Sequence, residues 1–167
     1  MPATSGAQET ARDYTWQDAV AELAGERTRA ESCARLLKIS ADNDEAALHR
    51  GEIAYSDAKA EVDAVIAGLV VVLAQRGLPP KLSDLEARLS NGVKKREAFC
   101  TDVVENSSGD RGSKNIIVDV LGAAFEPLLD AVVEIYKFES EKSMLTRKTI
   151  QTQLEATKWS SFAEIKA

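Results

Sequence analysis

Apolar residues recur every three or four positions along most of this chain, and this spacing is the strongest constraint on its fold. In the N-terminal third they form one stripe, and charged residues fill the positions between them. Thr15 followed by Asp18 approximates a capping box, which predicts that a helix begins there. We expect this helix either to break at the polar residues 40–44 or to continue for about 35 residues. The stripe comprises Trp16, Val20, Leu23, Ala30, Ala34, Leu37 and Leu48.

Four further segments repeat this spacing, and Gly51 predicts a helix stop that would create an N-terminal helical hairpin. Whether the last two segments join through residues 140–143 stays open. We therefore predict an all-α fold, an antiparallel bundle of four to five main helices with a kinked central helix at Pro127. The 57–76 segment is expected to share the centre with that helix. The four segments span about 57–76, 83–105, 114–135 and 145–158.

The composition favours one helical domain. Only 9 Gly and 4 Pro interrupt the 167 residues, and 44% of the chain is hydrophobic, which supports helix over an all-β fold. Residues 1–13 are small and polar and are predicted to be a disordered N-terminal segment. Residues 14–167 are predicted to form a single helical-bundle domain.

The two most apolar stretches do not predict a membrane span. The run 65–74 is too short, and three acidic residues interrupt 116–133. The N-terminus also lacks the basic and then apolar pattern of a signal peptide. We therefore expect a cytoplasmic protein, of the type found in bacteria, with no membrane partner.

The expected redox state of the two cysteines follows from the expected compartment. In a cytoplasm Cys33 and Cys100 would stay reduced. Both lie on or beside an apolar face, where buried thiols pack as small hydrophobes. A disulfide between them remains geometrically possible.

The net charge of −6 argues against nucleic acid as a partner, because an acidic chain repels a phosphate backbone. The middle of the chain is mildly basic, with a run of three cations. A nucleic-acid-associated protein is kept as a third hypothesis, and a low-salt shift assay would test it. It would use Lys94, Lys95, Arg96, Arg111 and Lys114.

Glu126, Asp130 and Glu134 are spaced by four and share one helix face. Carboxylates on facing helices can hold divalent metals in a bundle, so these three residues are candidate metal ligands. The Glu-x-x-His pair of di-iron bundles and the paired carboxylate motifs of all-α pyrophosphatases are absent. The other interpretation is the solvated face of an apolar helix.

The remaining motifs predict no catalytic residue and no cofactor. His49 is the only histidine, so a nucleophile–His triad would need it as the base, and a surface or capping role is the alternative. The glycines of 109–114 do not have the spacing of a phosphate-binding P-loop.

Trp159, Phe162 and Ile165 follow one another at spacing three near the C-terminus. Such anchors can dock into a groove on a partner, so they are candidate partner-binding residues. A terminal turn of this kind can also fold back and seal the core of its own bundle.

Together these patterns predict a non-enzymatic helical protein that acts through protein–protein contacts. Long helices with more apolar surface than one chain covers suggest self-association, most simply a homodimer. The alternative is a small-ligand or divalent-metal-binding bundle enzyme with a carboxylate-lined pocket.

Overall fold

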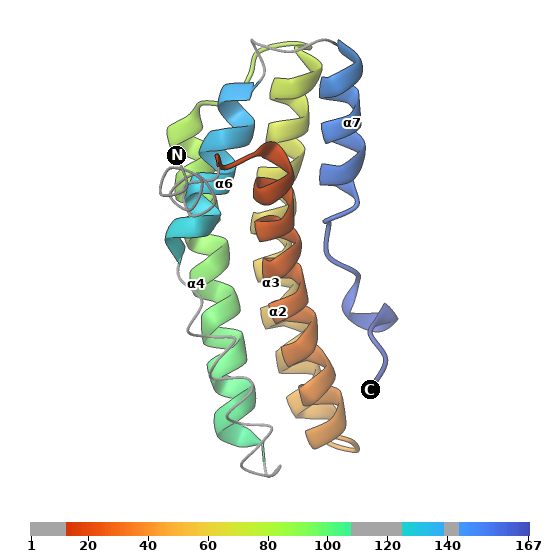
Figure 1. The fold of residues 1–167 in the computed structure, drawn as a ribbon. Coiled ribbons are helices and arrows are strands. Elements are labelled where there is room, and N and C mark those ends of the chain that lie inside the picture. The colour runs from red at the N-terminus through yellow and green to blue at the C-terminus, as the bar shows by residue number, and fades with distance from the viewer. Residues whose placement is uncertain (1–12, 108–124, 139–143) are drawn as a thin grey trace, which may run out of the picture.

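The structure is a computed structural model that describes residues 13–107, 125–138 and 144–167. Within these ranges the chain forms five α-helices and one short 3-10 helix, and no strand. The all-α prediction is therefore confirmed (Figure 1). The elements are α2 (Trp16–Ser40), α3 (Glu45–Ala74), α4 (Leu82–Asn106), α6 (Phe125–Lys137), α7 (Met144–Glu155) and η2 (Phe162–Glu164).

The long helix α3 is the centre of the bundle, because it contacts α2, α4, α6, α7 and η2. Its neighbours α2 and α4 run antiparallel to it, and the shorter α6 and α7 lie on opposite sides of the α2–α3 pair (Figure 1). Helix α6 packs mainly on α2 and α4, and α7 packs mainly on α3. The apolar 57–76 segment thus supplies the C-terminal part of α3, and it lies at the centre of the bundle as its pattern predicts.

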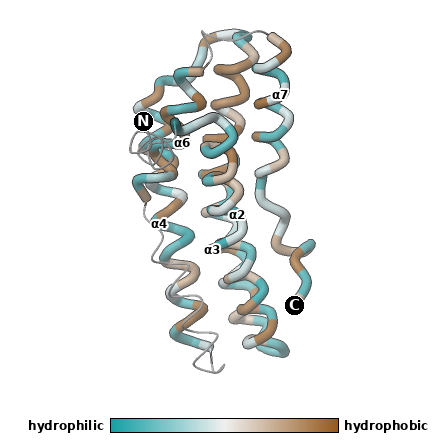
Figure 2. The backbone as a smooth tube through the Cα atoms, viewed as in Figure 1, coloured by the Kyte–Doolittle hydropathy of each residue, from teal (hydrophilic) through white to brown (hydrophobic). Residues whose placement is uncertain are grey.

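Hydrophobic and hydrophilic residues alternate along each helix at the helical repeat (Figure 2). The buried side chains of every helix join in one core, which the C-terminal residues complete. The hydrophobic effect is therefore shared along the full length of the bundle rather than concentrated at one helix pair.

The predicted start of the first helix is confirmed. The Thr15 amide donates to the Asp18 carboxylate at 2.8 Å, and the Asp18 amide donates to the Thr15 hydroxyl at 3.3 Å. These two bonds satisfy amide groups that the first turn of a helix leaves without partners.

The structure contradicts the predicted hairpin at Gly51. Helix α2 ends at Ser40, and α3 begins at Glu45 with Asp44 as its N-cap, so the turn lies in the polar patch 40–44. Gly51 is buried inside α3, where a β-carbon would lie only 2.0 Å from a methyl carbon of Leu37. Glycine is used here for the close approach of two helices and not for a helix end.

Several predictions fall wholly or partly outside the described residues. Residues 1–12 of the predicted disordered segment are not described. The described part of α6 begins two residues before Pro127, so the stretch that would define a kink there also lies outside. The connection 139–143 is likewise not described, but α6 and α7 run in opposite directions and are two separate helices (Figure 1).

Candidate functional site

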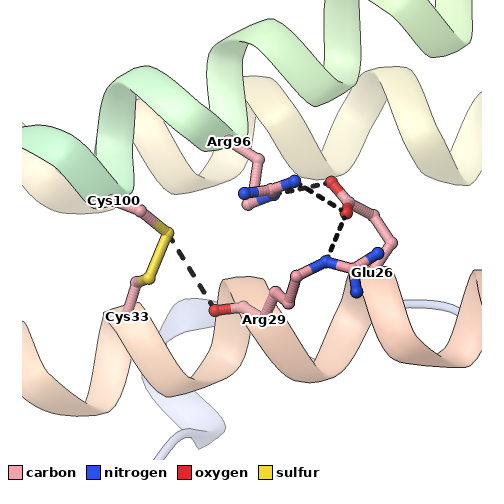
Figure 3. The surroundings of a disulfide bond; sticks show 5 residues. All are labelled: Glu26, Arg29, Cys33, Arg96 and Cys100. Carbon is pink, nitrogen blue, oxygen red and sulfur yellow. Dashed lines mark hydrogen bonds and ion pairs between the residues drawn. A yellow bond between two sulfur atoms is a disulfide. The ribbon is translucent and has the colours of Figure 1, made fainter. Parts of the chain in front are cut away.

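Cys33 of α2 and Cys100 of α4 form a disulfide, with their Cα atoms 5.4 Å apart (Figure 3). Both side chains are fully buried. The expectation of two reduced thiols is therefore wrong, because the two apolar faces that carry them meet at this level of the bundle. Stable disulfides are typical of oxidising compartments, so the cytoplasmic prediction loses one of its supports.

Arg96, one turn before Cys100 in α4, forms an ion pair with Glu26, two turns before Cys33 in α2, and neither side chain is exposed to solvent (Figure 3). Arg96 donates from Nε to Oε2 at 2.8 Å and from Nη2 to Oε1 at 3.0 Å. Arg29 Nε adds a third bond to Oε1 at 3.0 Å. We call these three residues the ionic cluster.

The ionic cluster fixes how α2 and α4 face each other. Two buried charges lose their hydration, and only close, directional pairing offsets that loss. The pairing is incomplete, because no described residue accepts a hydrogen bond from Arg96 Nη1. A sideways shift or rotation of either helix would separate the charges, so the cluster and the disulfide together set the register of this helix pair.

The burial of Arg96 also corrects the interpretation of the basic run. Of its three cations, only Lys94 and Lys95 are exposed, and Lys95 Nζ lies 3.2 Å from a Glu61 carboxylate oxygen. Arg111 and Lys114 lie outside the described residues. The described structure therefore assembles no basic surface from this set.

The three C-terminal anchors Trp159, Phe162 and Ile165 lie in the chain's own core, each less than 10% exposed. Tyr55 of α3 is their aromatic partner, with ring centroids 5.5 Å from Trp159 and 5.8 Å from Phe162. In this conformation the anchors seal the core of their own bundle and are not available on the surface. Self-packing was the alternative that the sequence offered to binding a partner.

Side chains of α2 and α3 hold the backbone of residues 156–167, which we call the C-terminal segment. Two carboxylates accept its amide protons, Asp63 from Trp159 at 3.1 Å and Glu31 from Ser160 at 3.0 Å. Three cations and one hydroxyl donate to its carbonyl groups. These pairs are Arg27 with Ala156 (2.6 Å), Arg35 with Lys166 (3.2 Å), Lys38 with Phe162 and with Ile165 (2.6 Å), and Tyr55 with Ser160 (2.7 Å).

The pKa values of three groups in or beside the C-terminal segment are shifted. Burial, aided by nearby acids such as Glu31, raises the pKa of Tyr55 well above 10.0. Burial and the charge of Lys166 lower the pKa of Lys38, which also lies 4.4 Å from the centre of the Phe162 ring. Hydrogen bonds from the backbone and side chain of Ser161 lower the pKa of Glu164. The C-terminal segment is thus held by polar groups as well as by its anchors.

Of the candidate metal ligands, Glu126 and Asp130 are exposed and Glu134 is half-buried. Burial and nearby acids, Asp130 and Glu134 among them, raise the pKa of Tyr14 to about 12. No three metal-ligating side chains among the described residues are placed to share one ion. The metal site stays a prediction from sequence.

His49 is exposed and lines an open hollow of about 430 Å³ together with Lys38, Glu45 and Glu52. No Ser, Thr or Cys is among the described residues that line this hollow. His49 therefore has no nucleophile beside it, and the geometry that would make it the base of a triad is missing there.

Comparisons with protein-family models, with curated proteins and with solved structures found no match. Within the described ranges, no helix has both the length and the apolar character needed to cross a lipid bilayer. Any proposal about the function of this chain therefore rests on its own sequence and structure.

Proposed function

We propose that this chain is a non-enzymatic, self-associating helical protein that acts through protein–protein contacts. The observation that carries the proposal is the paired surface of α2 and α3, called the groove below, which holds the C-terminal segment by its backbone and by three apolar anchors. Recognition of a peptide by its main chain, with pockets for a few spaced side chains, is a recurring mode of protein interaction.

Exchange of this segment between two copies would give a dimer without any new contact surface. Among the described residues, the long-range hydrogen bonds of the C-terminal segment go to α2 and α3, and an identical groove on a second copy offers the same partners. The short turn at 156–158 is the hinge that would redirect the segment. Swapping of an identical element is a low-cost route to a dimer.

Apolar surface at one end of the bundle supports association as well. Leu78 in the α3–α4 loop is 94% exposed, and Met144 and Leu145 at the start of α7 are 74% and 78% exposed. All three lie at the same end of the bundle, because α3 ends and α7 begins there (Figure 1). Exposed apolar groups that gather on one end of a protein are typical of interaction surfaces.

Native mass spectrometry of the full chain at micromolar concentration tests the proposal, with a dimer as the expected result. Substituting both aromatic anchors, Trp159→Ala with Phe162→Ala, should weaken the dimer because the segment loses its apolar contacts in either groove. Lys158→Ala, an exposed neighbour in the same segment, is the matched control and should leave the mass unchanged. A monomer for the unmodified chain would refute self-association.

The alternative function, a metal-binding bundle enzyme, has less support because Glu126 and Asp130 face solvent. The same spectrum, recorded on protein purified without chelator, would reveal it as extra mass equal to a divalent ion. As for location, the disulfide favours an oxidising compartment over the bacterial cytoplasm that the sequence predicts.

A further inference from the structure

The Cys33–Cys100 disulfide has no path to solvent in the folded chain, because both cysteines are fully buried. The disulfide and the ionic cluster both join α2 to α4, so covalent and ionic contacts hold the same two helices together. Cys33 lies one turn after Arg29, and Cys100 lies one turn after Arg96, so the ionic cluster covers one side (Figure 3). Cys100 Sγ is in contact with the Arg29 carbonyl oxygen at 4.0 Å.

Exchange between thiols and disulfides requires that an attacking thiolate reach a sulfur atom. In the folded chain nothing can reach either sulfur unless α2 and α4 move apart at this level. Such a movement would expose the ion pair of Glu26 and Arg96 together with the core residues around it. The opening that frees the sulfurs is therefore the cooperative opening of the bundle and not a local fluctuation.

We propose that this disulfide is a redox lock that is set before folding and then sealed by it. It forms while the chain is open, when Cys33 and Cys100 each give up a proton and together transfer two electrons to an oxidant of the disulfide class. That oxidant leaves as two thiols. Once α2 closes on α4, neither reduction nor oxidation proceeds without reopening.

The redox state of the pair thus records the environment in which the chain folded. A chain that folds with an oxidant keeps its bond when it later meets a reductant. A chain that folds under reducing conditions buries two thiols, which a later oxidant cannot join until the bundle opens.

The test is the rate at which dithiothreitol reduces the oxidised full chain, followed by counting free thiols with a maleimide that adds mass. We expect the folded chain to react at least about a hundredfold more slowly than the chain unfolded in urea. In a series of sub-denaturing urea concentrations, the fold increase in rate should match the fold increase in the unfolding equilibrium constant. A folded chain that reacts as fast as the unfolded one would overturn the proposal.

Two variants separate cooperative opening from direct access. Gly51→Ala, which forces α3 against Leu37, should speed reduction by the same factor as it raises the unfolding equilibrium constant. Gly25→Ala, whose new carbon would meet only Arg29 Nη1 at 3.7 Å, should not speed it. If Gly51→Ala does not fold, the urea series decides alone. A reduction rate that changes neither with the Gly51→Ala substitution nor with urea would show that dithiothreitol reaches the sulfurs without opening of the bundle.

Discussion

Replacing one member of the buried ion pair should destabilise the bundle far more than replacing both. Arg96→Met removes two of the three hydrogen bonds to Glu26 and leaves that carboxylate with Arg29 alone. Breaking a buried pair typically costs about 3–5 kcal/mol. Because Arg29 remains in place at 3.0 Å, we expect about 3 kcal/mol, the lower end of that range.

Glu26→Met should cost more, about 4–5 kcal/mol. It leaves two guanidinium groups without their carboxylate, and only one of them can find water. The Arg29 side chain is 15% exposed, whereas that of Arg96 is fully buried. An uncompensated buried cation is therefore left only by this variant.

The double variant, Glu26→Met with Arg96→Met, should return to within about 1 kcal/mol of the unmodified chain or exceed it, because apolar replacement of a buried pair is often neutral or stabilising. The assay is urea unfolding of the oxidised protein, followed by circular dichroism, with the slope compared between variants. Lys95→Met, at the neighbouring position of α4, is the matched control. Its partner Glu61 lies 3.2 Å away but the lysine side chain is 47% exposed, so less than about 1 kcal/mol should be lost. Single variants that each cost under about 1 kcal/mol, or costs that simply add, would refute this reasoning.

Two further predictions concern the core and the alkaline limit of stability. Gly51→Ala should lower the free energy of unfolding by about 1–3 kcal/mol, because its β-carbon overlaps Leu37. Gly25→Ala should raise the free energy of unfolding by up to about 1 kcal/mol, because alanine favours helix over glycine and its β-carbon has room. Thermal unfolding of both variants checks these values. Stability should fall as pH rises above 10.0, because an unfolded tyrosine loses its proton there while buried Tyr55 keeps its own until a higher pH. Tyr55→Phe should flatten that fall and cost about 1 kcal/mol at neutral pH, where the bond to the Ser160 carbonyl is lost; an unchanged pH profile of urea unfolding would contradict this.

Helical periodicity predicted the fold class and the positions of the long helices, because it depends only on local spacing. It failed at Gly51, where a sequence cannot show whether a glycine ends a helix or lets another helix approach. The expectation that both cysteines stay reduced was wrong as well, since their pairing depends on which helices become neighbours. The disulfide appears only once α2 and α4 are side by side.

The ionic cluster was missed, although the sequence carries a signal for it. Glu26 occupies the stripe position between Leu23 and Ala30, and Arg96 occupies the one between Val93 and Phe99. Two opposite charges that interrupt the apolar stripes of two helices indicate a buried pair. By contrast, the spacing of the C-terminal anchors offered core sealing as one of two roles, but it could not show the backbone partners of the segment, which come from distant α2 and α3.

The disulfide also divides the chain mechanically. A stretching force applied to the two ends of the oxidised chain would pass from Cys33 directly to Cys100, so it would bypass the span between them, a sequence separation of 67. That span contains all of α3 and, at full extension, corresponds to about 230 Å of chain. Under load the oxidised protein would extend only the segments outside the two cysteines, and α3 would carry no force. The reduced protein would extend by the additional length of the span between the cysteines.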